Sequence, residues 1–84
     1  MTLQDLIAKL LPQFKFFDIN YRHGDLTLQY FVTPNNGVTK TITLEIQQNV
    51  NGADFDVNLY VNDTFKQVFV SVDAERIIRE MPKQ

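Results

Sequence analysis

The strongest constraint on the fold is the stretch 38–61, in which apolar and polar residues alternate on both sides of an Asn51-Gly52 dipeptide. Alternation with a period of two is typical of strands that bury one face. Asn-Gly is strongly favoured in the two-residue turns that join antiparallel strands. The sequence therefore predicts a hairpin in which Ile46 pairs with Val57, with one apolar face and one polar face.

Further turn signals divide the rest of the chain into three more predicted strands. His23-Gly24 and Asn62-Asp63 each favour a tight turn, and residues 33–37 are typical of a longer loop. We expect strands over 14–22, 25–33, 38–48, 54–61 and 64–72.

Counting outward from these turns assigns each side chain to a face of the sheet. Lys40 and Lys66 fall on the apolar face, each near a strand end, where the stem can pack while the ammonium group reaches water. The expected apolar pairs include Ile19–Leu28, Phe17–Tyr30, Val32–Val38, Leu44–Leu59, Val57–Val68 and Phe55–Val70.

Apolar residues at helical spacing predict one helix at each end of the chain. The first begins after an N-cap at Thr2 and ends at Pro12, and the second begins after Asp73 and ends at Pro82. We therefore expect a single α+β domain over 1–84. Its fold is a five-stranded antiparallel meander in the order α-β-β-β-β-β-α, with both helices packed on one face and the other face open.

Composition excludes several kinds of chemistry. The 84 residues include no cysteine, which excludes disulfides, zinc–thiolate sites and cysteine nucleophiles. The net charge of −2 does not favour direct binding to nucleic acid or to an anionic membrane. The first residues lack the basic region of a signal peptide, and no apolar run could cross a bilayer, so we expect a cytoplasmic protein.

Side chains suited to catalysis are scarce. Ser71 and His23 are the only serine and histidine, and they are expected in a strand and in a distant turn, so they do not form a catalytic pair. Glu45, Asp54 and Asp56 form a cluster of acids. On an open, solvated face, nothing would give two of these acids different roles. We expect no enzyme activity, no cofactor and no metal site.

Residues 48–52 have the pattern Q-x-V-x-G, and in this respect the chain resembles the cystatin protease inhibitors. In that family the pattern forms a hairpin tip that enters the cleft of papain-like proteases, and a sheet wraps around a helix. Here two more strands separate the helix from this hairpin, and the chain has no Trp for the family's second loop. The resemblance implies, as an alternative function, inhibition of a cysteine protease by the tip 48–52.

The predicted outward face of the sheet combines acids with large aromatic side chains. Acidic surfaces favour basic partners, and exposed aromatics in patches are typical of binding sites. We predict a non-enzymatic protein–protein interaction module that binds a basic protein surface. It would be a small adaptor, inhibitor or accessory subunit of the kind found in phages and mobile elements. The expected partner-binding residues are Phe16, Phe31, Glu45, Asp54, Asp56, Asn58, Tyr60, Phe65 and Phe69.

The fifth predicted strand, 64–72, has an apolar outer edge. Its valines are expected to point inward, and Phe65 and Phe69 outward. An open edge of this kind invites pairing with another strand. We therefore expect a homodimer through this edge or the neighbouring face.

A second alternative function is binding of a small ligand between the helices and the sheet. Tyr21, Tyr30 and His23 are the side chains that would supply polar contacts in such a pocket.

Overall fold

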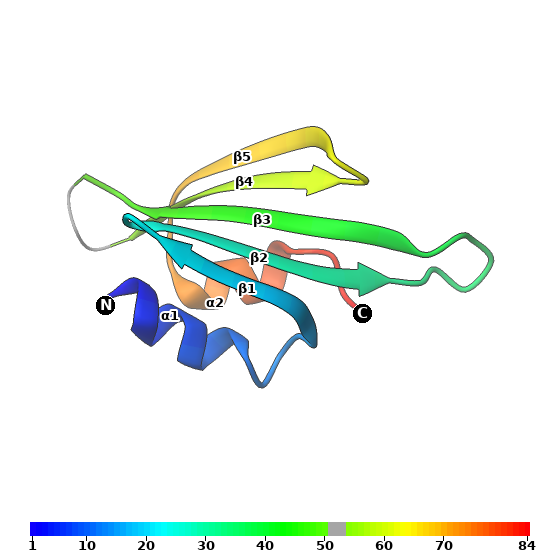
Figure 1. The fold of residues 1–84 in the computed structure, drawn as a ribbon, viewed down its shortest axis with the longest axis horizontal. Helices are drawn as coiled ribbons and strands as arrows, with labels where there is room; N and C mark the ends of the chain where they lie inside the picture. Colours follow the sequence, from blue (N-terminus) through cyan, green and yellow to red (C-terminus); the bar gives the residue numbers. More distant parts are fainter. Residues whose placement is uncertain (51–53) are drawn as a thin grey trace.

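The structure is a computed structural model that describes residues 1–50 and 54–84, and it confirms the predicted α+β fold. The elements are α1 (Leu3–Leu10), β1 (Phe16–Arg22), β2 (Asp25–Val32), β3 (Lys40–Gln48), β4 (Phe55–Val61), β5 (Thr64–Val72) and α2 (Ala74–Glu80). The strands form one antiparallel meander sheet in the order β1-β2-β3-β4-β5. Both helices lie against the same face of this sheet, and the opposite face is left bare (Figure 1).

Side-chain caps begin both helices where the sequence predicts. Asp5 N–H donates to Thr2 Oγ1 over 3.1 Å, and Thr2 N–H donates to Asp5 Oδ2 over 2.9 Å, which completes a capping box. This bonding lowers the pKa of the Asp5 carboxyl. At α2, Arg76 N–H donates to Asp73 Oδ1 over 2.9 Å. The caps satisfy amide groups that have no partner inside the helices.

The core lies between the helices and the inner face of the central strands. Edge strand β1 is mostly exposed, because the helices cover only part of the sheet. The largest fully buried side chains are Leu6, Leu10, Leu26, Leu28, Tyr30, Ile42, Leu44, Ile46, Phe55, Val57, Ile77 and Met81.

In the described residues, no helix is long and apolar enough to cross a membrane.

The hairpin formed by β3 and β4 has the predicted register. Ile46 pairs with Val57 and Leu44 with Leu59, so the apolar set of both strands lies on the helix side. The predicted turn residues Asn51 and Gly52 lie outside the described residues.

Two other predicted turns have the backbone that short hairpins require. His23 and Gly24 have φ values of 51° and 82°, and Asn62 and Asp63 have φ values of 50° and 65°. Two consecutive residues with positive φ match the right-handed twist of the strands they join. Glycine adopts this conformation without strain, and Asn and Asp are the side chains that tolerate it best.

The predicted register between β2 and β3 is wrong by two residues. Val32 pairs with Lys40 instead of Val38, because the connection is longer than predicted. Thr33 Oγ1 and Thr39 Oγ1 lie 2.9 Å apart and share a hydrogen bond across its base. A slip of two residues keeps every side chain on its predicted face.

The prediction that Phe16 points outward is wrong. A bulge in β1 pairs Phe16, rather than Phe17, with Tyr30. The ring of Phe16 packs on the core, with its centroid 5.7 Å from that of Tyr30. The same bulge turns Phe17 to the bare face, where it stacks on Phe31.

A second bulge overturns the predicted faces in the middle of β5. Tyr60 pairs with Phe65 and Leu59 with Gln67, which leaves Lys66 as an extra residue without a partner in β4. One extra residue exchanges the two faces for the residues that follow, until a further irregularity returns Val72 to its predicted inward position, where it is 1% exposed. Lys66, which was predicted to point inward near a strand end, lies at this irregularity.

The outward prediction for Phe69 is wrong for the same reason. Phe69 pairs with Val57 and is 8% exposed, so it belongs to the core. Val68 and Val70, which were expected inward, are 48% and 60% exposed.

Tyr30 is fully buried in β2, and its hydroxyl donates to the main-chain oxygen of Pro82 over 2.8 Å. Burial raises the pKa of this hydroxyl above its ordinary value of 10.0. The folded protein therefore holds the Tyr30 proton more tightly than the unfolded chain does. This contribution to stability is complete below about pH 10 and is lost as the pH rises above it.

We expect the free energy of unfolding to fall with pH above about pH 10, and to fall less steeply in Tyr30→Phe. Urea unfolding at a series of pH values measures both slopes. Tyr21→Phe, which changes a tyrosine that is 52% exposed, is the matched control and should keep the parent slope. Equal slopes for the parent and Tyr30→Phe would contradict this account.

Candidate functional site

The helices leave one side of the sheet bare, and we call this side the open face. It carries four carboxylates, from Asp18, Asp25, Glu45 and Asp56, against one guanidinium, from Arg22. The open face consists of Phe17, Asp18, Asn20, Arg22, Asp25, Thr27, Gln29, Phe31, Thr41, Thr43, Glu45, Gln47, Asp56, Asn58, Tyr60, Phe65 and Val68.

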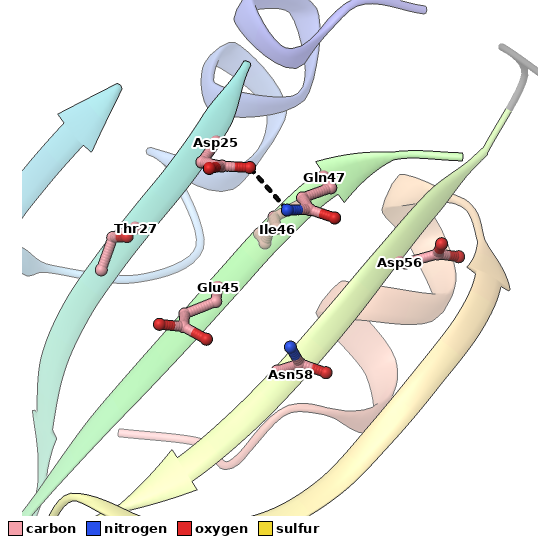
Figure 2. A pocket seen from close by; sticks show the side chains of 7 residues that line it. All are labelled: Asp25, Thr27, Glu45, Ile46, Gln47, Asp56 and Asn58. Atoms are coloured by element: carbon pink, nitrogen blue, oxygen red, sulfur yellow. Dashed lines mark hydrogen bonds between the residues drawn. The ribbon is translucent and has the colours of Figure 1, made fainter. Parts of the chain in front are cut away.

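An open hollow of about 200 Å³ lies on this face over β2, β3 and β4, toward the end of the sheet at which β2 begins. Side chains from three adjacent strands line it, as Figure 2 shows. Gln47 Nε2 donates to Asp25 Oδ1 over 2.6 Å, which links β3 to β2 at one end of the hollow. The hollow is lined by Asp25, Thr27, Glu45, Ile46, Gln47, Asp56 and Asn58.

Asp56 also holds the end of β5 in place. Its Oδ1 accepts the Ser71 N–H over 3.0 Å and an Asn49 Nδ2 hydrogen over 3.1 Å. Asn49 Nδ2 lies 3.0 Å from Ser71 Oγ as well. These bonds support Ser71, which has a φ of 55° in a further irregularity of the strand. Asp56 is therefore a structural residue as well as part of the open face.

An aromatic pair lies beside the hollow on β4 and β5. The rings of Tyr60 and Phe65 meet edge to face, with centroids 5.7 Å apart. A hydrogen bond to Glu45 raises the pKa of the Tyr60 hydroxyl. The Tyr60 side chain therefore lies close to one of the acids of the hollow.

A second aromatic pair lies toward the other edge of the sheet, on β1 and β2. Phe17 and Phe31 stack with ring centroids 4.3 Å apart and planes inclined by 17°. The two side chains are 49% and 48% exposed. Stacking of this kind keeps two large apolar groups ordered in contact with water.

Of the nine predicted site residues, the open face brings together Phe31, Glu45, Asp56, Asn58, Tyr60 and Phe65. Asp54 is half-buried just before β4, and its main-chain oxygen accepts the Asn49 N–H over 2.8 Å. Phe16 and Phe69 lie on the helix side. The sequence reasoning missed Phe17, Val68 and Val70, which the bulges expose.

The side chains suited to catalysis are far apart. His23 lies in the turn between β1 and β2, whereas Ser71 lies in β5 at the other edge of the sheet. Among residues 1–50 and 54–84, no three His, Asp or Glu side chains gather as a metal ion would need.

The two alternative functions stay predictions. In the cystatin-like segment, Val50 is 98% exposed, while Asn51 and Gly52 lie outside the described residues. Of the expected pocket contacts, Tyr30 is buried and bonded to a main-chain oxygen, and Tyr21 is exposed on β1.

Comparison with known proteins gives no relative: no family model, curated protein or solved structure matches this chain.

Proposed function

We propose that this protein is a non-enzymatic interaction module that binds a basic surface of another protein through its open face. The proposal rests on one observation: a polar hollow lined by carboxylates shares a face that the helices leave bare with two aromatic pairs. Acidic and aromatic side chains have different roles in binding at such a surface. Carboxylates select a partner by charge, and aromatic side chains supply contact area.

The arrangement fits Lys or Arg side chains from the partner. The hollow presents Asp25, Glu45 and Asp56 from three neighbouring strands, and it is open to solvent. An Arg side chain bound there would donate to carboxylate oxygens in pairs. Arginine also stacks on aromatic faces, and Tyr60 offers one beside the hollow, two residues along β4 from Asn58.

The proposal that the module is not an enzyme is supported by what the carboxylates do. Asp25 accepts a hydrogen bond from Gln47, and Asp56 accepts two that hold β5 and the end of β3. These acids are engaged in structural bonds on an open surface. Catalytic pairs of acids instead lie in a cleft that gives each a different role.

Reversing charge in the hollow is expected to weaken this binding strongly. The double variant Asp25→Lys/Glu45→Lys places two ammonium groups where the partner brings its own, and like charges in contact cost several kcal/mol. We expect capture of the partner from a lysate of the source cells to fall at least about tenfold. Mass spectrometry of the captured proteins measures this loss.

The matched control makes the same change in charge on the opposite side of the molecule. Glu75→Lys/Glu80→Lys alters two exposed ion pairs of α2, with Lys9 and Arg76, and should capture the partner as the parent does. Circular dichroism and thermal melting check that both variants fold. Equal capture by both variants, or equal loss, would reject the open face as the binding surface.

A further inference from the structure

The outer edge of β1 is exposed along its length. All residues from Phe17 to Arg22 are exposed, and past the bulge the pairing with β2 is regular from Asp18 to Arg22. The other edge strand, β5, is interrupted at Lys66 and again near Ser71. Bulges of this kind prevent an edge from adding another strand. The regular free edge of the sheet is therefore β1.

The main-chain groups that face outward on β1 follow from its turn. A two-residue turn makes its flanking residues, here Arg22 and Asp25, a hydrogen-bonded pair. Because such pairs alternate along antiparallel strands, Arg22, Asn20 and Asp18 direct their N–H and C=O groups toward β2. Ile19 and Tyr21 direct theirs toward the free edge, where a new strand would bond.

We propose that two copies of this chain pair through β1, antiparallel, with the two-fold axis at Asn20. In this register Ile19 of each copy lies opposite Tyr21 of the other. These are the residues whose main-chain groups face outward, so each such pair exchanges two N–H···O bonds. The contact is self-complementary, as a two-fold interface must be.

The charged side chains of β1 favour this register over registers shifted by one residue. With the axis at Asn20, Asp18 of each copy lies directly opposite Arg22 of the other, on the open-face side. Placing the axis at Ile19 or Tyr21 would keep the main-chain bonds but would set Asn20 opposite Asp18 or Arg22. Only the register centred on Asn20 forms two opposite-charge pairs.

The same register covers exposed apolar surface on the helix side. Ile19 and Tyr21 are 43% and 52% exposed although they point to the side that bears the core. Pairing an aromatic with a β-branched side chain across two strands is favourable, and it occurs twice in the dimer. The interface is separate from the hollow of the open face, so this inference does not depend on the proposed function.

Cysteine cross-linking tests the register directly, because the chain has no cysteine of its own. At the two-fold axis the Asn20 residues form a pair without main-chain bonds, with Cα atoms about 4.5 Å apart, a separation that a disulfide spans. Under mild oxidation Asn20→Cys should become a covalent dimer in high yield. Asp18→Cys, the control, should stay uncross-linked, because its two copies lie four residues from each other along the strands.

Charge exchange gives a second test, read by light scattering against the chain mass of 9.8 kDa. The parent should show twice this mass. Asp18→Arg and Arg22→Asp should each weaken self-association at least about tenfold, yet should associate with one another when mixed. Asp18→Arg/Arg22→Asp should restore the homodimer. A parent that stays at 9.8 kDa at its highest soluble concentration, or a dimer that Asn20→Cys does not cross-link, would overturn the proposal.

Discussion

Phe69→Lys is expected to lower the free energy of unfolding by at least about 3–5 kcal/mol, the range for loss of a buried phenylalanine. Phe69 is 8% exposed and packs in the core opposite Val57. The variant also places an ammonium group in an apolar environment, which adds a desolvation cost. For a domain of 84 residues this approaches the whole stability, so circular dichroism should show a largely unfolded chain.

Phe65→Lys is the matched control in the same strand. Phe65 is 53% exposed on the open face, where it contacts the Tyr60 ring. Its loss should cost no more than about 1.5 kcal/mol, the upper value for an aromatic pair. Urea unfolding of both variants measures the difference. The reverse order of stability would mean that β5 has no bulge at Lys66 and that the simple alternating register is correct.

The second large effect is expected from the end of the chain. Stopping the chain after Glu80 removes Met81, which is 2% exposed, and the Pro82 oxygen that accepts the Tyr30 hydroxyl. Truncating a buried methionine costs about 2–5 kcal/mol, and leaving a buried hydroxyl without a partner costs about 1–3 kcal/mol. We expect a loss of at least about 3 kcal/mol, although chain ends are commonly dispensable.

A chain that stops after Lys83 is the control for this truncation. It keeps Met81 and the Pro82 oxygen and loses only Gln84, whose exposed amide bonds to Lys15 and to Phe31. We expect a loss of about 1 kcal/mol or less for this variant. Thermal melting of the two truncated chains makes the comparison, and similar midpoints for both would show that the end of the chain does not close the core.

Local signals in the sequence were sufficient for the order of elements and for most faces. Turn dipeptides such as His23-Gly24 set both the position and the register of a hairpin, because they permit only one short loop. The register between β2 and β3 was missed because a longer loop does not specify its own length. That error was harmless, since a slip of two residues preserves the faces.

The bulges had larger consequences for the site. One extra residue at Lys66 buried Phe69 and exposed Val68, and the bulge in β1 exchanged Phe16 for Phe17. No turn or periodicity marks a bulge in the sequence. Lys66, assigned to the apolar face, lies at such an irregularity, but Lys40 had the same assignment and pairs regularly with Val32 at the start of β3.

The uneven distribution of charge gives the molecule a preferred orientation in an electric field. The open face carries four acids and one base, a charge of −3, whereas the whole chain carries −2, so the remainder carries +1. This separation of charge gives the molecule an electric dipole whose negative end is the open face. In the electric field of a basic partner, this dipole orients the open face toward the partner before the two proteins come into contact. Association should therefore be fast at low ionic strength and slow markedly as salt is added.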